Sequence, residues 1–246
     1  MAIPRTLLIT ATLTAALPAA ALAGTGTNGA DDLTLDVGVK PAKAGERVGL
    51  TYSQSLVAKD GSRVGDSIKQ IKITLPRGFR FDVGAVAQCK ESTIEDPNQG
   101  PAACPPASVV GRGAATADAR PAIPDPLQAQ VTAYNGVLDT DVNGMPQPPV
   151  PALLVVGEVA SLNAKAFLPA EIRGRTLVLE TAAPVPGMQS AYTIRDLSLK
   201  LRKAGSSKKP YLRSSSTCPK GGWTFAQTVS FFDTAPVTAK DKVACS

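Results

Sequence analysis

Residues 217–232, close to the end of this 246-residue chain, constrain the fold more than any other stretch. Apolar side chains at Trp223, Phe225, Val229 and Phe231 alternate with small or polar ones. An alternation with a period of two is typical of a β-strand that turns one face to the core. We therefore predict a long, central strand in this stretch, with the only tryptophan of the chain in the core.

Glycine and proline punctuate the rest of the chain, which contains 21 of each. Short apolar runs between such residues favour strands joined by turns and argue against long helices. We predict an all-β fold, a two-sheet antiparallel β-sandwich that is immunoglobulin-like or jelly-roll-like, with about ten strands. A single domain over 33–246 is favoured, and the alternative is two β-domains divided near 145–151. The other predicted strands are 33–39, 48–52, 71–75, 104–117, 127–133, 153–159, 164–168, 176–180, 192–201 and 211–216.

Residues 1–23 have the features of a secretory signal peptide. A single positive charge at Arg5 precedes an apolar run over 7–17, and small residues end at Ala23 before the expected cleavage point. The run is short for a membrane span, and no later stretch approaches about 20 uninterrupted apolar residues. We expect a secreted, extracellular protein without a membrane span, in which 24–32 form a flexible leader and regular structure begins at Leu33.

Four cysteines in an exported chain suggest two disulfides, for which three pairings are possible. Pairing of sequence neighbours is the simplest, and it joins Cys89 to Cys104 and Cys218 to Cys245. The first bond would close a loop of about 15 residues and contribute roughly 3 kcal/mol on the chain-entropy model. The alternative is a four-thiolate metal site, but the sequence contains no Cys-x-x-Cys pair of the kind that usually forms one.

The middle of the chain combines a strand end with a spaced pair of cysteines. The sequence Leu-Pro-Arg-Gly-Phe occupies 75–79, Cys89 follows, and Cys104-Pro105 then precedes Ser108, Val110 and Gly111. This pattern resembles an uncharacterised exported module of high-GC Gram-positive bacteria. The resemblance implies an extracellular β-sandwich and no catalytic activity.

The sequence contains no histidine, which excludes whole classes of enzyme. Neither a Ser-His-Asp or Cys-His nucleophilic site nor a zinc site with histidine ligands can form. A pair of carboxylates is enough for glycoside hydrolysis, and Glu158, Glu171 and Glu180 lie in predicted strands or at their ends. A carboxylate-based glycan hydrolase is therefore the alternative function, although aromatic residues, at 4% of the chain, supply few surfaces on which sugars could stack.

Asp139, Asp141 and Asn143, followed by Gly144, match the first half of a calcium-binding loop. Such a loop needs oxygen ligands at alternate positions and a glycine at its turn. Its twelfth position holds Val150 instead of an acidic residue, so any Ca²⁺ site here is expected to be weak. The alternative is a polar turn, because Asp, Asn and Gly are also turn residues. No other cofactor is expected.

Six basic residues are predicted to gather at the tip of a hairpin formed by 192–201 and 211–216. A positive tip attracts anionic envelope polymers or lipid headgroups with little specificity, and the alternative is a solvated loop. The net charge of +6 is moderate, and Tyr211 is the only aromatic residue among the basic ones, so nucleic-acid binding is not predicted. The six residues are Lys200, Arg202, Lys203, Lys208, Lys209 and Arg213.

These observations predict a secreted, non-catalytic protein, structural or binding, of the cell envelope or the extracellular space. Anionic envelope polymers or another exported protein are the expected partners. The sequence specifies neither a ligand nor a reaction.

Overall fold

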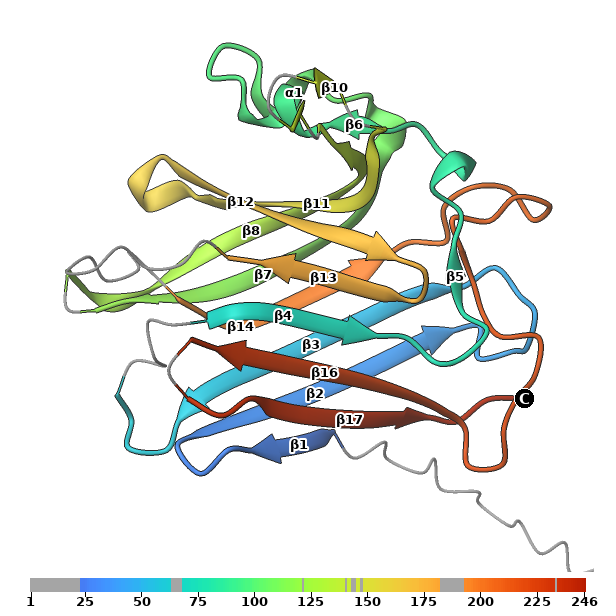
Figure 1. The fold of residues 1–246 in the computed structure, drawn as a ribbon, viewed down its shortest axis with the longest axis horizontal. Coiled ribbons are helices and arrows are strands. Elements are labelled where there is room, and N and C mark those ends of the chain that lie inside the picture. Colours follow the sequence, from blue (N-terminus) through green and yellow to red (C-terminus); the bar gives the residue numbers. More distant parts are fainter. Residues whose placement is uncertain are drawn as a thin grey trace, which may run out of the picture.

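The structure is a computed structural model that describes residues 23–62, 68–120, 122–139, 141–142, 145–146, 148–181, 193–232 and 234–246. Over these ranges the chain is almost entirely β-structure, with one short α-helix and four 3-10 helices. The predicted all-β, antiparallel fold is confirmed (Figure 1).

One curled sheet of 13 strands forms both layers of the molecule. Its strand order is β1 (Gly24–Thr27), β2 (Asp31–Lys40), β3 (Gly49–Ala58), β14 (Thr193–Leu201), β7 (Val109–Ala119), β8 (Ile123–Leu138), β11 (Val150–Val159), β12 (Ala164–Arg173), β13 (Thr176–Glu180), β4 (Ile68–Thr74), β16 (Trp223–Phe231) and β17 (Val237–Val243). The remaining strand, β6 (Cys89–Lys90), pairs in parallel with β8. In Figure 1, β12, β13, β4, β16 and β17 form the front layer, and β8, β7, β14, β3 and β2 cross behind them.

The two ends of the strand order meet, so the sheet nearly closes into a barrel-like sandwich. β17 lies against β1 and β2, and the buried carboxylate of Asp241 on β17 accepts a hydrogen bond of 2.7 Å from the backbone N–H of Val37 on β2. Gly24 and Gly26 of β1 permit this approach, because a Cβ at either position would overlap a backbone carbonyl of β17. The seam therefore depends on one carboxylate and two residues without side chains.

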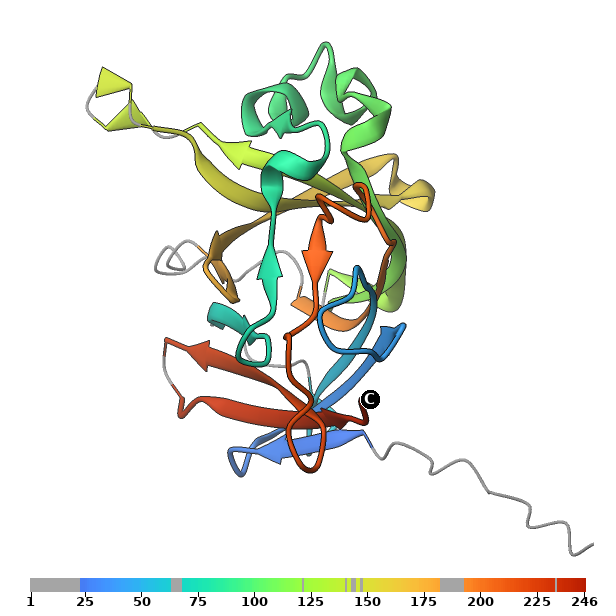
Figure 2. The same cartoon turned by 90° about the vertical axis from the view of Figure 1, so that its right-hand side faces the viewer.

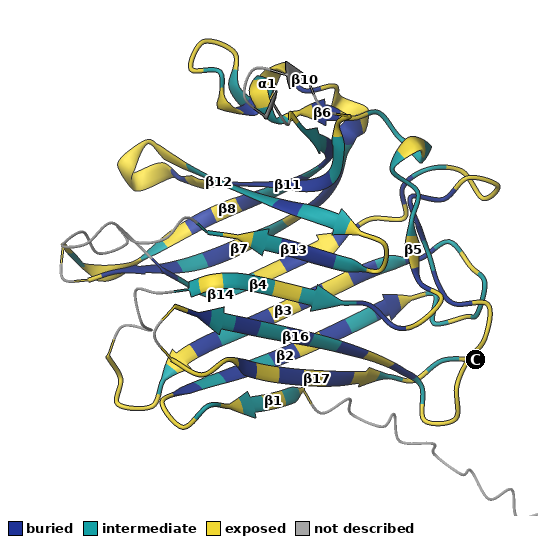
Figure 3. Cartoon of the chain, in the orientation of Figure 1, coloured by how far each residue is buried: buried dark blue, intermediate teal, exposed yellow. Residues whose placement is uncertain are grey.

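β16 contributes the bulkiest side chains to the core, as its alternation predicts. Trp223, Phe225, Val229 and Phe231 are buried, while the even-numbered residues between them are half-buried or exposed (Figure 3). The ring of Phe79 meets the rings of Trp223 and Phe225 edge to face, at centroid distances of 4.9 and 5.5 Å. The strand begins later than the predicted residue 217, and it lies next to the last strand of the order instead of at the centre.

A segment outside the sandwich covers the outer face of β11 and is tied by the first disulfide. Cys89 is bonded to Cys104, and with Ile94 they pack against Leu154 and Val156 of β11. β11 is therefore buried on both faces, which explains its unbroken apolar run. The segment comprises β6, α1 (Glu91–Glu95), η2 (Gly100–Ala103) and η3 (Pro106–Ser108). β5 (Arg80–Phe81) and η1 (Val83–Ala85) lead into it, and Phe81 and Ala85 pack against the main core.

The second disulfide joins Cys218, just before β16, to Cys245 after β17. Both predicted pairings are therefore confirmed, and together they use all four cysteines. The indole N–H of Trp223 donates to the carbonyl of Thr217 at 3.1 Å, so the turn that carries Cys218 is also fixed to the core. The bond and the indole contact hold the last strand pair together at one end.

Two predictions about strand boundaries and partners are wrong. Among the described residues, regular structure is already present at Gly24, where β1 pairs with β2, so 24–32 are not a flexible leader that ends at Leu33. β14 pairs with β3 and β7, so it forms no hairpin with residues 211–216; in that segment β15 (Leu212–Arg213) pairs with β5 instead (Figure 2). The alternative domain boundary near 145–151 falls where the chain enters β11, and β11 pairs directly with β8.

Candidate functional site

A cavity of about 120 Å³, here called the outer chamber, lies inside the sandwich. Inward positions on four adjacent strands carry alanine or glycine at this place, so their side chains leave space between the layers. The small residues are Ala115 and Ala117 on β7, Ala129 on β8, Gly157 on β11, and Ala164 and Ala166 on β12.

The outer chamber reaches the molecular surface at one end of the sandwich. Leu162 of η4 (Ala160–Leu162) lines that end and is 48% exposed, and Lys165 beside it is exposed as well. η4 lies at the end opposite β5 (Figure 1). At the β5 end, β5 and β15 run across the sandwich, and the rings of Phe81 and Tyr211 meet at a centroid distance of 5.5 Å (Figure 2). The sandwich thus has an aromatic-lined end and an end at which the chamber approaches solvent.

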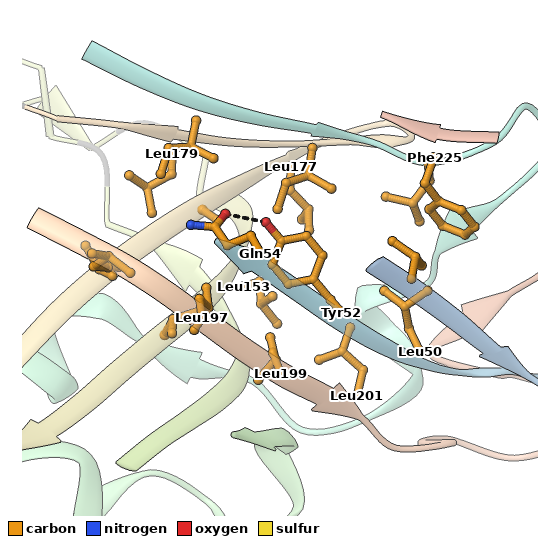
Figure 4. Close-up of a pocket in the computed structure, with 18 residues that line it drawn as sticks. Leu50, Tyr52, Gln54, Leu153, Leu177, Leu179, Leu197, Leu199, Leu201 and Phe225 are labelled. Atoms are coloured by element: carbon orange, nitrogen blue, oxygen red, sulfur yellow. Dashed lines mark hydrogen bonds between the residues drawn. The ribbon is translucent and has the colours of Figure 1, made fainter. Parts of the chain in front are cut away.

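A second cavity of about 80 Å³, here called the inner chamber, adjoins the first. Leucine and isoleucine side chains from both layers line most of it, and Tyr52 and Gln54 of β3 are its polar members (Figure 4). Four residues line both chambers, which places the two cavities next to each other: Val155, Leu168, Ile194 and Leu197.

Three buried polar side chains form a network at the wall of the inner chamber. The hydroxyl of Tyr52 lies 2.5 Å from Oε1 of Gln54 and 2.7 Å from Oε1 of Gln227 on β16, so it can donate to either. Nε2 of Gln227 donates to Oε1 of Gln54. Burial raises the pKa of Tyr52 above its ordinary value, and its hydrogen bond to Gln227 lowers the pKa by less. The phenol is therefore neutral, and the network carries no charge.

The lining of the two chambers is almost free of charge. Tyr52 and Lys165 are the only ionisable side chains among the described residues that line them. The ammonium group of Lys165 lies 3.4 Å from the carboxylate of Glu158, and both side chains are more than half exposed. Burial of an uncompensated charge is strongly unfavourable, whereas burial of an apolar group is favourable. This space therefore suits an uncharged, mostly apolar guest and contains no acid–base pair.

Asp139 of the predicted calcium loop has a structural partner in the disulfide-tied segment that covers β11. Its carboxylate accepts hydrogen bonds from the backbone N–H and the hydroxyl of Ser92, in the first turn of α1. These bonds lower the pKa of Asp139, the hydroxyl having the largest effect. Its own backbone N–H donates to the carboxylate of Glu91 at 3.2 Å. Asp139 therefore acts as an external N-terminal cap for the helix.

The other two predicted calcium ligands cannot be compared with the structure in the same way. Asn143 and the side chain of Asp141 lie outside the described residues, although the backbone of β9 (Asp141–Val142) pairs with β10 (Met145–Pro146). Over the described part of the chain, no group of three or more acidic or cysteine side chains is arranged to hold a metal ion.

The six basic residues do not form the tip of a hairpin. Two of them use their guanidinium groups locally: Nε of Arg202 donates to the carbonyl of Val109 at 2.8 Å, and Nη1 of Arg213 donates to the carbonyl of Gly45 at 3.3 Å. Lys200 is exposed on β14 and Lys203, Lys208 and Lys209 are exposed in the loop that follows. These four lysines remain the candidate contacts for an anionic surface.

The three candidate carboxylates lie outside the chambers and are paired with basic side chains. Glu158 contacts Lys165, as described above. Glu171 and Glu180 lie on adjacent strands on either side of Arg173, whose Nη2 is 2.6 Å from one carboxylate and 3.7 Å from the other. The structure therefore brings two of the predicted carboxylates together, with a guanidinium group between them.

Sequence reasoning missed the chambers and the two glutamines beside them. Gln227 shares the inward face of β16 with its aromatic residues, and Gln54 occupies an inward position of β3 between Tyr52 and Leu56. A glutamine at an inward position of an otherwise apolar alternation was the signal that could have identified both. The alanine-rich run in 114–119 was the corresponding signal for the outer chamber.

A scan against protein-family models, a search of curated proteins and a search of solved structures each found no match to this chain. Two disulfides are typical of extracellular proteins. Within the described residues, no helix has the length and apolar character needed to cross a membrane.

Proposed function

We propose that this is a secreted binding protein of the cell envelope or extracellular space that holds a small apolar molecule inside its sandwich. The observation that carries the proposal is the pair of adjoining chambers, which have uncharged walls and approach the surface at one end. Export is supported by the features of residues 1–23, by two disulfides, and by the start of β1 at Gly24, directly after the expected cleavage point.

The size of the chambers sets the scale of the guest. An engineered apolar cavity of about 150 Å³ binds benzene, and the two chambers together exceed that volume. A guest of about ten non-hydrogen atoms would gain on the order of 0.3–0.8 kcal/mol per atom, which gives dissociation constants from roughly millimolar to micromolar.

The direct test measures binding of α-methylstyrene, an uncharged aromatic hydrocarbon of suitable size, by calorimetry and by thermal unfolding. At a concentration ten times the dissociation constant, a ligand that binds only the native state adds about 1.4 kcal/mol of stability. This corresponds to an increase in Tm of about 3–5 °C for a domain of this size. No heat of binding and no change in Tm would contradict the proposal.

Two neighbouring positions on β8 provide the variant and its matched control. Ala129 points into the outer chamber and Gln128 is exposed on the outer face. Ala129→Leu fills the chamber and should weaken binding of α-methylstyrene by at least about 10-fold, because the lost space equals several methylene groups of the guest. Gln128→Leu adds the same side chain outside and should leave the affinity unchanged. Equal effects of the two substitutions would place the binding site elsewhere.

A further inference from the structure

We propose that the guest carries an uncharged hydrogen-bond acceptor oxygen, such as the carbonyl of a ketone or ester, and that the side-chain amide of Gln54 donates to it in the inner chamber. This inference rests on the proposed function and adds the chemical class of the ligand. The ligand is then an apolar body with one neutral acceptor, not a hydrocarbon and not an ion.

Gln54 is a buried polar group with a donor that the protein leaves unused. The residue is 4% exposed and lines the inner chamber. Its oxygen accepts from Tyr52 and Gln227, whereas its nitrogen makes no hydrogen bond to any residue that the structure describes. Figure 4 shows the nitrogen directed away from Tyr52, toward the side on which Leu179 and Leu197 lie. The nitrogen is not among the fully buried side-chain atoms without a partner, which are Asn135 Oδ1, Thr193 Oγ1 and the Tyr211 hydroxyl in the described residues, so it remains accessible from the chamber. A guest that accepts a hydrogen bond from this nitrogen would therefore bind more tightly than one that leaves it unpaired.

The network fixes which atom of Gln54 faces the chamber. With the oxygen toward Tyr52 and Gln227, the phenolic O–H has an acceptor and the amide N–H of Gln227 has one too. If both amides were reversed, the phenol would face two N–H donors and its own O–H would have no acceptor. The nitrogen of Gln54 therefore points into the chamber, and the protein presents a donor to the guest.

The surroundings of this donor select against ions. All other residues that line the inner chamber are apolar except Tyr52, whose hydroxyl is already used in the network. A carboxylate or an ammonium group in this position would lack a counter-charge. The ammonium group of Lys165 is at the outer end of the other chamber and is paired with Glu158.

The test compares three ligands of one shape: acetophenone, its hydrocarbon isostere α-methylstyrene, and benzoate. Water solvates the ketone better than the hydrocarbon, so the two affinities cannot be compared directly. The informative quantity is the acetophenone affinity divided by the α-methylstyrene affinity, measured in the native protein and again in Gln54→Leu. This comparison cancels the difference in hydration. This ratio should be about 3- to 10-fold lower in Gln54→Leu than in the native protein, because only the ketone loses a hydrogen bond when the amide donor is removed. Benzoate should bind at least about 100-fold more weakly than acetophenone.

Gln227→Leu is the matched control, because it disturbs the same network but leaves the Gln54 amide in the chamber. The ratio of acetophenone to α-methylstyrene affinity in this variant should stay near that of the native protein. A readout without any variant guards against failure of Gln54→Leu to fold. In NMR spectra of the native protein, the chemical shifts of the Gln54 side-chain N–H protons should change more on addition of acetophenone than on addition of α-methylstyrene.

The outcomes separate this inference from the proposed function. If α-methylstyrene binds but the affinity ratio is the same in Gln54→Leu, or if the Gln54 signals respond equally to both ligands, the inference is wrong and the apolar binding site remains. Binding of benzoate as tight as that of acetophenone also overturns the inference. If α-methylstyrene does not bind, the proposed function itself is wrong.

Discussion

Gly157 of β11 offers the sharpest test of the outer chamber, because the effect of adding a single methyl group there can be calculated from the structure. A Cβ at this position would lie 3.7 Å from the Cβ of Ala129 and 4.0 Å from the Cβ of Ala166, both ordinary van der Waals distances. The backbone of Gly157 does not have a positive φ, so alanine can adopt it without strain. Gly157→Ala should therefore stabilise the protein.

Two terms contribute to the expected gain. Replacement of glycine by alanine at a compatible backbone position contributes about 0.4–1 kcal/mol, because the unfolded chain loses conformational freedom. Burial of one methyl group contributes up to about 0.8 kcal/mol. We expect the free energy of unfolding to rise by about 1–1.5 kcal/mol, with an increase in Tm of roughly 2–5 °C.

The assay is equilibrium unfolding in urea with the disulfides intact, and Gly136→Ala is the control. Gly136 lies on the neighbouring strand β8, but its Cβ would meet the carbonyl oxygen of Cys89 at 2.6 Å and overlap the side chain of Leu154. That substitution should cost about 1–3 kcal/mol. If Gly157→Ala destabilised the protein, the space inferred between β8, β11 and β12 would not exist. If Gly136→Ala had no cost, the close packing of β8 against Cys89 and Leu154 would be wrong, and the control would fail.

Three further predictions concern other parts of the molecule. Asp139→Ala should destabilise the protein by no more than about 1 kcal/mol at neutral pH. Hydrogen bonding to Ser92 lowers the pKa of Asp139 in the folded protein, so this difference in stability should shrink as the pH falls below the pKa of an unfolded aspartate, about 3.9. Urea unfolding of both proteins at neutral and at acidic pH checks this. Replacing Cys89 and Cys104 by alanine should cost about 3 kcal/mol in urea unfolding yet leave α-methylstyrene binding intact, and a loss below about 1 kcal/mol would contradict the entropic estimate. Asp241→Ala leaves the backbone N–H of Val37 on β2 unpaired where β17 meets β2, and it should lower the free energy of unfolding in urea by about 1–3 kcal/mol. Hydrogen exchange of the Val37 amide should become faster. Unchanged exchange would show that the contact between β17 and β2 does not need the carboxylate.

Local patterns in the sequence determined the class of structure and the inward face of β16. The alternation from Trp223 to Phe231 predicts a strand regardless of its neighbours, because successive side chains on any strand point to opposite faces. The cysteine pairing was also accessible, since short loops between sequence neighbours are the easiest to close. These features depend on residues that lie close together in the chain.

Strand partners and the cavity were decided only by the tertiary structure. β14 lies between β3 and β7, and not beside 211–216, because closure of the whole sheet fixes which edges meet. Gln54 and Gln227 are 173 residues apart in the chain but hydrogen-bonded in the core. The alanines of β7, β8 and β12 predict small inward side chains on each strand, and only the curling of the sheet that brings these strands around one space turns them into a chamber. Local periodicity specifies which way a side chain points, whereas the space in front of it depends on residues brought there from distant parts of the chain.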